Sequence, residues 1–432
     1  MSSGQLAERR ILMLLENCAY PQDTRVQLEA SALAAAGYRV SVICPAAPGQ
    51  PRRESVGGVE VYRFRAARWG SGLWGYLWEY SRAMLATFRL SLRVWIREGF
   101  DVLHAHNPPD TFVLIAVFYK LFGKRFVFDQ HDLAPEMYLA RLGDRGNWLV
   151  HQALVLFEKL SCRTADLVIT TNESHKLVQM LRGGVRKNRI AVVRTGPDLG
   201  RLRLVNPHSW LRQEGVTIIG YVGVMGIQDG VDYLLRALHH LVHDLGRTDF
   251  YCVLIGGGDA WAGLNVLARQ LGLEKYVRFT GHLSYDDVMP YLSATDICVV
   301  PDPSNPYNDR STVIKLMEYM ALGKPVVAFD LPEHRFTAQS AVVYVRPNDE
   351  LAFAQTLAAL MDDPVRREAM GRFGRRRVET VLAWKYSAPK LIQAYNQLLS
   401  IQGEGVTAAN PLAFIPAPPE KTAEKARNAA AP

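Results

Sequence analysis

The sequence predicts an α/β protein built from two doubly wound domains that face each other across a cleft. Its 432 residues are too many for one ordinary hydrophobic core, and nearly half of them are apolar. Short apolar runs alternate with helical segments along most of the chain, which is typical of parallel sheets covered by helices. A stretch rich in Gly, Pro and Asn at 194–209 interrupts this alternation and predicts a hinge.

The first series of apolar runs predicts an N-terminal domain at residues 1–200. Its expected strands are Ile11–Leu15, Tyr38–Ile43, Asp101–His104, Arg125–Asp129, Asp166–Thr170 and Ile190–Val193. A helix is expected at Asp23–Ala36, and Gly37 would end it. Strand, helix and strand at this spacing form a right-handed parallel crossover, and in such open sheets ligands bind beyond the carboxyl ends of the strands.

A second series follows the hinge, which we place at 201–209, and predicts a C-terminal domain at 210–384. Its expected strands are Ile218–Val222, Tyr251–Ile255, Val277–Thr280, Ile297–Val300, Val326–Phe329 and Val342–Val345. Residues 385–400 are expected to form a helix that packs back on the N-terminal domain. Residues 401–432 contain few apolar side chains and many Ala, Pro, Lys and Glu, which predicts a disordered tail.

Composition excludes several classes of protein. The five cysteines are odd in number and scattered, which favours buried thiols in a reducing compartment. The N-terminus has no signal pattern, and no apolar run approaches the roughly 20 residues that span a bilayer. We therefore expect a cytoplasmic protein. The net charge of +8 is not accompanied by a nucleic-acid-binding motif, so we expect no nucleic-acid partner.

Residues 68–97 combine tryptophans with arginines and apolar residues. A helix that lies on a membrane often has this composition, with aromatic rings at the headgroup boundary and arginines facing anionic lipid. The alternative is a helix packed on the N-terminal sheet whose arginines extend to solvent. We favour the first interpretation, which makes an anionic membrane surface a partner and places the protein at the inner face of the plasma membrane.

The most informative stretch begins at Ser311 and reads as a loop, a short helix, a turn and a buried strand. Ser311 or Thr312 is predicted to cap the helix, so that the N–H groups of Val313 and Ile314 point at an anion. Glu318 lies about one and a half turns further along, where a carboxylate can accept hydrogen bonds from a pair of sugar hydroxyls. An anion site beside a polyol site predicts a nucleotide-sugar site, with Glu318 counted as catalytic.

The stretch that begins at Ser311 also resembles the C-terminal signature of glycosyltransferase family 4, the retaining group with the GT-B fold. The resemblance runs from about Ile11 to about Leu399. It implies two Rossmann-like domains and metal-independent transfer of a sugar from a UDP- or GDP-linked donor, without a cofactor. Glu318 takes the place of the family's second glutamate, which contacts the ribose. Arg310 takes the place of the first, which contacts the donor sugar.

Two glycine turns follow strands of the C-terminal domain, and we expect both to approach the donor diphosphate. Their glycines are Gly223, Gly226, Gly256 and Gly257. A loose glycine pattern is a weak signal by itself, but a strand-to-helix turn with glycines lets the backbone approach a phosphate. The base is expected near residues 281–283, where main-chain groups can bind it.

Positive charge near the diphosphate departs from the family pattern. The family usually has an arginine and a lysine at the first glycine turn, and Met225 and Asp229 lie near those places here. Lys315 or Arg310 is then expected to supply the charge, and we count Lys315 among the catalytic residues. For Lys315 the alternative is an ordinary solvated lysine.

On the N-terminal side, His131 matches the family's histidine that contacts the donor sugar, and we count it as catalytic. Asp132 and Glu136 follow it and are placed on the acceptor side. The alternative for this stretch is a capping and turn sequence at a junction between strand and helix.

His104 and His106 lie at the end of a strand, with their side chains on the same face. Such a pair can bind a metal ion, but no third ligand is evident, so we expect no metal site. His106 is instead expected to have a structural role or to lie on the acceptor side, where Arg25 is also placed.

Together these features predict a glycosyltransferase that acts on a polyprenyl-linked sugar in exopolysaccharide, O-antigen or cell-envelope glycan synthesis. A nucleotide-sugar 2-epimerase of the same fold is one alternative, and it would release its product without an acceptor. A catalytically silent binding module is another, because Arg310, Met225 and Asp229 depart from the family pattern. The intact His131, Glu318 and helix-cap segment count against that alternative.

Overall fold

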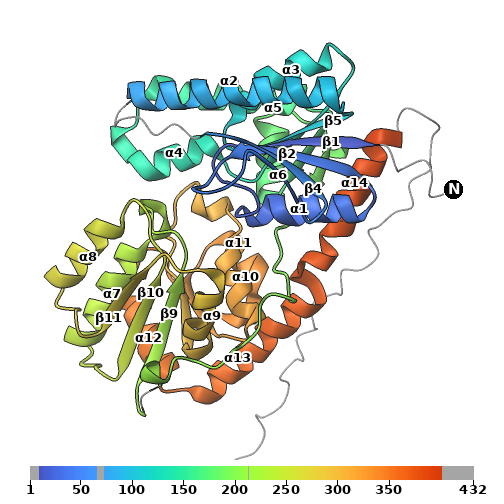
Figure 1. The fold of residues 1–432 in the computed structure, drawn as a ribbon. Coiled ribbons are helices and arrows are strands. Elements are labelled where there is room, and N and C mark those ends of the chain that lie inside the picture. Colours follow the sequence, from blue (N-terminus) through green and yellow to red (C-terminus); the bar gives the residue numbers. More distant parts are fainter. Residues whose placement is uncertain (1–8, 66–72, 213, 401–432) are drawn as a thin grey trace, which may run out of the picture.

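The computed structural model describes residues 9–65, 73–212 and 214–400. They form two α/β domains, each built around one sheet with helices packed on it (Figure 1). The α/β class and the two doubly wound domains are therefore confirmed. The predicted tail at 401–432 and the first part of the stretch at 68–97 lie outside the described residues.

The N-terminal sheet has eight strands in the order β3-β4-β2-β1-β5-β6-β7-β8. The strands are β1 (Arg10–Leu14), β2 (Arg39–Pro45), β3 (Arg53–Val56), β4 (Val59–Phe64), β5 (Val102–His106), β6 (Arg125–Gln130), β7 (Leu167–Thr170) and β8 (Ile190–Val192). All neighbours are parallel except β3 and β4, which form an antiparallel hairpin. The hairpin is absent from the predicted strands because β3 is short and polar. Gly57 and Gly58 form its turn with φ of 59° and 83°.

The helices of this domain lie on both faces of the sheet. They are α1 (Thr24–Ala35), α2 (Leu73–Arg97), α3 (Val113–Lys120), α4 (Ala134–Leu142), α5 (Trp148–Thr164) and α6 (Glu173–Leu181). Asp23 caps α1 by accepting a hydrogen bond from Val26 N at 2.9 Å, and Gly37 follows its end with φ of 93°. Successive residues of β1 point to opposite faces, so Ile11 packs in the core with α1 and Leu12 in the core with α2.

The C-terminal sheet has six parallel strands in the order β11-β10-β9-β12-β13-β14. The strands are β9 (Thr217–Val222), β10 (Phe250–Ile255), β11 (Val277–Gly281), β12 (Ile297–Val300), β13 (Val326–Phe329) and β14 (Val342–Val345). The helices are α7 (Val231–His243), α8 (Trp261–Gln270), α9 (Tyr285–Ala294), α10 (Ile314–Ala321), α11 (Pro332–Ala338), α12 (Glu350–Met361) and α13 (Pro364–Arg377). Strand order reverses at β9, and ligands bind at such switch points in open sheets.

The last helix, α14 (Ala388–Ser400), returns from the C-terminal domain to the N-terminal sheet (Figure 1). Leu391 and Tyr395 belong to the same buried core as the residues of α1. Tyr38 donates a hydrogen bond to Asn396 Oδ1 at 2.6 Å, and the Tyr395 hydroxyl lies 2.8 Å from His104 Nδ1. Helix α14 therefore completes the core of the first domain.

Candidate functional site

The loop that precedes α10 joins the two domains at the carboxyl ends of their strands. The Tyr307 hydroxyl donates to Asp132 Oδ1 at 2.8 Å. The Asn172 side-chain amide donates to Arg310 O at 2.8 Å and to Thr312 Oγ1 at 2.9 Å. Because Asp132 follows β6 and Asn172 follows β7, the loop lies against the end of the N-terminal sheet. The candidate site is therefore lined by both domains.

The start of α10 differs from the prediction. The helix begins at Ile314, and its cap position is Val313, which has no capping side chain. Ser311 Oγ donates to Tyr307 O at 2.8 Å, and Thr312 Oγ1 accepts the bonds from the N-terminal domain. The prediction that Ser311 or Thr312 caps the helix is wrong, since both side chains hold the loop instead. The first N–H groups of α10 consequently have no side-chain acceptor.

Glu318 lies on α10 and is partly exposed. Among the residues that the structure describes, its carboxylate accepts no hydrogen bond and forms no ion pair. Burial raises the pKa of Glu318, and the charge of Arg201 in the hinge opposes that rise. A partly buried carboxylate with no partner among the described residues is an available acceptor for ligand hydroxyls.

The two glycine turns touch each other through their backbones. Gly223 N donates to Ile255 O, and Met225 N donates to Gly257 O, each at 3.0 Å. A Cβ atom at Gly256 would lie 2.0 Å from Gly223 O, and Gly256 has a φ of 125°. Only glycine fits at position 256, and the packing brings both turns together at the ends of β9 and β10.

Lys315 lies inside the C-terminal domain and is not a solvated lysine. Its Nζ lies 3.1 Å from Asp302 Oδ2 and 3.6 Å from Asp229 Oδ1, and 4.7 Å from the centre of the Tyr221 ring. Burial disfavours its charge, but the two aspartates and Tyr221 raise the pKa of Lys315. The Lys315 charge is therefore matched by two carboxylates. Asp229, which takes the place of a family lysine, is one of these partners.

Arg310 differs from Lys315 in having no acidic partner. One of its guanidinium nitrogens donates to Pro306 O at 2.6 Å. Within the described part of the chain, no carboxylate forms an ion pair with it. Its side chain is half-buried, and its backbone carbonyl accepts a hydrogen bond from Asn172 of the N-terminal domain.

His131 lies at the end of β6 on the N-terminal side of the site. The Asn107 side chain fixes the turn, because its Oδ1 accepts from His131 N at 2.9 Å and from Asp132 N at 3.1 Å. The His131 ring is 13% exposed, and its Nδ1 lies 3.7 Å from Asp129 Oδ2. Burial would lower the pKa of His131, but the buried carboxylate of Asp129 raises it. The Asp129 carboxylate therefore favours the protonated form of the His131 ring.

Arg25 and His106 lie behind His131, and neither reaches the acceptor side. Arg25 is 4% exposed and binds Asp129 through two hydrogen bonds of 2.7 Å. The same guanidinium lies 3.0 Å from Glu29, and His106 Nδ1 lies 3.0 Å from Asp129 Oδ2. The prediction that places Arg25 and His106 on the acceptor side is wrong, because both are buried: Arg25 pairs with carboxylates closed off from solvent, and His106 has a structural role beside Asp129.

This cluster also contains metal-ligand atoms that the sequence does not reveal. Glu29, His104, His106 and Asp129 place one such atom each within 4.8 Å of one another. The sequence showed no third ligand beside the two histidines, but the fold places two carboxylates there, one from α1 and one from β6. The Arg25 guanidinium already faces both carboxylates, so its charge occupies the position that a cation would take. The residues present do not fit a metal ion.

Glu136, on α4, is also engaged elsewhere. Its carboxylate accepts two hydrogen bonds from Arg182, at 2.6 and 2.9 Å. Arg182 also binds Glu158, so this network ties α4 and α5 to the end of α6. The prediction of an acceptor role for Glu136 is wrong for this arrangement, because its oxygens are already paired. Asp132, by contrast, lies at the contact between the domains.

Helix α2 packs one face on the N-terminal sheet and exposes the other. Trp95 is packed against Tyr119 and Phe122. The exposed stripe alternates large apolar residues with arginines, and consists of Trp78, Arg82, Leu85, Arg89, Arg93, Ile96 and Arg97. Helix α3, the turn that follows it and helix α5 add exposed apolar side chains to the same domain, namely Leu114, Leu121, Phe122, Trp148, Leu149 and Leu156. We find no helix in the described segments that could cross a membrane.

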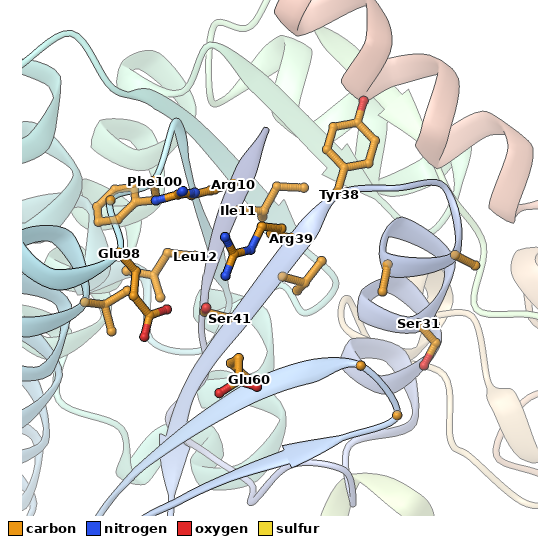
Figure 2. Close-up of a pocket in the computed structure, with 17 residues that line it drawn as sticks. Arg10, Ile11, Leu12, Ser31, Tyr38, Arg39, Ser41, Glu60, Glu98 and Phe100 are labelled. Atoms are coloured by element: carbon orange, nitrogen blue, oxygen red, sulfur yellow. The ribbon is translucent and has the colours of Figure 1, made fainter. Parts of the chain in front are cut away.

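A cavity of about 430 Å³ lies in the N-terminal domain, at the end of the sheet opposite the candidate site (Figure 2). Arg10, Arg39, Glu60 and Glu98 line it, at the starts of β1 and β2 and near the end of α2. Both glutamates pair with Arg53, at 3.2 and 3.0 Å. The cavity is at the amino-terminal ends of the strands, so it is separate from the candidate site.

Two protein families match the chain. Residues 22–196 match the family described as "Glycosyl transferase 4-like domain". Residues 216–363 match the family described as "Glycosyl transferases group 1". Each match falls within one of the two domains.

Similar proteins extend along most of the chain. The 2-deoxystreptamine glucosyltransferase of Streptomyces kanamyceticus is 24% identical over 383 residues, which are 85% of this chain and 96% of that protein. The D-inositol 3-phosphate glycosyltransferase 1 of Catenulispora acidiphila is 25% identical over 323 residues, 69% of this chain and 73% of that protein.

Solved structures share the fold. Sucrose-phosphate synthase from Thermosynechococcus elongatus has a TM-score of 0.76 at 20% identity, and the match covers 91% of this chain and 100% of that one. Anabaena HepE in complex with UDP and glucose has a TM-score of 0.69 at 16% identity, covering 90% of this chain and 100% of that one.

Proposed function

Because the chain is a glycosyltransferase of the family 4 type with the GT-B fold, we propose that it transfers a sugar from a nucleoside diphosphate to a lipid-linked acceptor. The anomeric configuration would be retained, without a metal ion. The acceptor would be a polyprenyl-linked sugar in the synthesis of a cell-envelope glycan.

The main support for a donor site at α10 is Glu318, whose carboxylate has no partner among the described residues. The first N–H groups of the same helix have no side-chain acceptor. A ribose diol would donate to Glu318, and the diphosphate would accept from the start of α10 and from the turns at Gly223 and Gly256. Solved neighbours of this fold bind UDP or ADP. The reaction would break the bond between the anomeric carbon and the phosphate oxygen. The acceptor oxygen would bond to that carbon, and its proton would pass to the departing diphosphate.

His131 would face this donor site from the N-terminal domain. Its raised pKa makes the protonated ring more populated, and a protonated ring donates strongly to a sugar hydroxyl. Asp129 would orient the ring by attracting Nδ1. His131 would therefore bind the sugar, rather than act as the base that takes the acceptor proton.

The observation that supports a membrane-bound acceptor is the exposed stripe of α2. Exposed tryptophan and leucine side chains insert between lipid headgroups, while the arginines between them attract anionic lipid. The apolar side chains of α3 and α5 would enlarge this contact. The N-terminal domain would then hold the acceptor side of the site near the bilayer.

Donor binding is tested by comparing Glu318→Gln with the wild type in titrations with UDP and GDP. Loss of a charge-assisted hydrogen bond of about 1–3 kcal/mol should weaken nucleotide binding about ten- to a hundredfold. Glu274→Gln, an exposed glutamate of the same domain, is the matched control and should bind as the wild type does. Equal affinities for all three proteins would place the ribose elsewhere.

Membrane binding is tested by sedimentation with vesicles that contain anionic phospholipid. The double variant Trp78→Ser, Leu85→Ser should leave more protein in the supernatant, and high salt should release part of the wild type. Val365→Ser removes a still more exposed apolar residue from the C-terminal domain and should have no effect. Wild-type protein that never sediments with the vesicles would argue for an acceptor that is not in the membrane.

A further inference from the structure

We propose that Arg310 binds the carboxylate of the donor's sugar, so that the donor is a nucleoside-diphosphate uronic acid. This inference rests on the proposed function, because it needs the donor to bind at α10. It adds the chemical class of the transferred sugar.

The position of Arg310 follows from the order of groups in the donor. With the ribose at Glu318 and the diphosphate at the start of α10, the sugar lies on the other side of the phosphates from Glu318. The residues on that side are those that precede the helix, and Arg310 is four positions before Ile314. The N-terminal domain closes the same space, because Asn172 binds the carbonyl of Arg310.

The charges around the site point to an anionic partner for this arginine. Arg194, at the contact between the domains, is matched by Glu333 at 3.6 Å, and Lys315, within the C-terminal domain, is matched by Asp302. Arg310 is half-buried, and among the described residues its guanidinium has only the carbonyl oxygen of Pro306 as acceptor. A guanidinium carries five N–H donors, so most of those of Arg310 remain for a ligand.

A uronic acid offers the group that this arginine fits. Its carboxylate is planar and accepts two parallel hydrogen bonds from a guanidinium, which is the strongest arrangement available to arginine. A neutral hexose presents a CH₂OH group at the same position and would leave the guanidinium charge unpaired. The site should therefore prefer the uronic acid over the hexose of the same configuration.

The competing assignment is that Arg310 binds the diphosphate. All sugar donors that are built on the same nucleotide contain this diphosphate. The two assignments differ in one measurable respect. If Arg310 binds the diphosphate, its loss weakens binding of the free nucleoside diphosphate. If Arg310 binds the sugar carboxylate, its loss leaves that binding unchanged.

The test uses the full chain and isothermal titration. UDP and GDP are titrated first, and the nucleotide that binds then selects the pair to compare: UDP-glucuronate with UDP-glucose, or GDP-mannuronate with GDP-mannose. Each ligand is measured against the wild type, Arg310→Gln and Arg310→Lys. Arg346→Gln, an exposed arginine of the same domain, is the control.

We expect the wild type to bind the uronic acid more tightly than the hexose. Arg310→Gln should weaken binding of the uronic acid about ten- to a hundredfold and leave the nucleoside diphosphate unchanged. Arg310→Lys should recover only part of the loss, since an ammonium cannot form the two parallel bonds.

Two results would overturn the inference while leaving the proposed function intact. One is a wild type that binds hexose and uronic acid equally. The other is an equal loss of affinity for the nucleoside diphosphate and for both sugars in Arg310→Gln, which would assign Arg310 to the diphosphate. Failure of the wild type to bind either nucleotide would overturn the proposed function as well.

Discussion

Replacing Lys315 with methionine would leave two buried carboxylates facing each other without a cation. Asp302 and Asp229 both lie within ion-pair distance of Lys315, and their side chains are 7% and 17% exposed. Methionine keeps much of the length and apolar volume of lysine, so the main change is the loss of charge. Burial raises the pKa of both aspartates even with the lysine present. Without it, the charged forms become still less favourable.

The expected cost follows from the geometry. Removal of one partner from a buried ion pair destabilises proteins by about 3–5 kcal/mol. For a domain of this size, each kcal/mol lowers the melting temperature by about 2–4 °C. The C-terminal domain should therefore melt about 6–20 °C lower in Lys315→Met, as measured by calorimetry and by urea unfolding. A fall in turnover in this variant would then arise in part from a smaller fraction of folded protein.

A second variant separates charge from packing. Adding Asp302→Asn and Asp229→Asn to Lys315→Met removes the uncompensated charge while keeping the shapes of the side chains. This triple variant should recover most of the lost stability, since replacing all members of a buried ion pair is often close to neutral. A Lys315→Met protein with the melting temperature of the wild type would refute the buried position of Lys315. A triple variant as unstable as the single one would show that packing, not charge, explains the loss.

Three further predictions address other parts of the fold. Burial raises the pKa of Glu29 to about 8 from the ordinary 4.5, so the stability that this group contributes is full below pH 4.5 and is lost as the pH rises through about 8. Glu29→Gln should therefore flatten the fall in unfolding free energy between about pH 5 and pH 8. An unchanged dependence of urea unfolding on pH would contradict this prediction. Tyr395→Phe removes a buried hydrogen bond to the N-terminal sheet and should lower the unfolding free energy by about 0.5–1.5 kcal/mol. Gly256→Ala should force the two glycine turns apart, because its Cβ would meet Gly223 O. Both UDP affinity and melting temperature should fall, whereas Gly263→Ala, which meets no neighbour, should change neither by more than a small amount.

The location of the strands could be predicted because it depends on local sequence. Apolar runs such as Val326–Phe329, bounded by turn residues, are buried on both faces of a parallel sheet and need no information from elsewhere in the chain. The hairpin at β3 and β4 lacks this signal, because its first strand is polar and partly exposed. The existence of the candidate site could be predicted in the same way, since the turns at the ends of strands are local features.

The partners of the charged side chains could not be predicted from the sequence. Arg25 and Asp129 are 104 positions apart, and their ion pair exists only because α1 crosses the end of β6. Tyr395 meets His104 only because the last helix returns to the first domain.

The sequence by itself determined two parallel sheets, the glycine turns and a carboxylate at a helix beside them. The tertiary structure alone decided which charges are free to meet a ligand. It paired Lys315, Arg25 and Glu136 within the protein and left Glu318 and Arg310 without ionic partners among the described residues. The physical reason is that burial follows the local pattern of apolar residues, whereas charge neutralisation depends on which distant segments meet at the edge of a sheet.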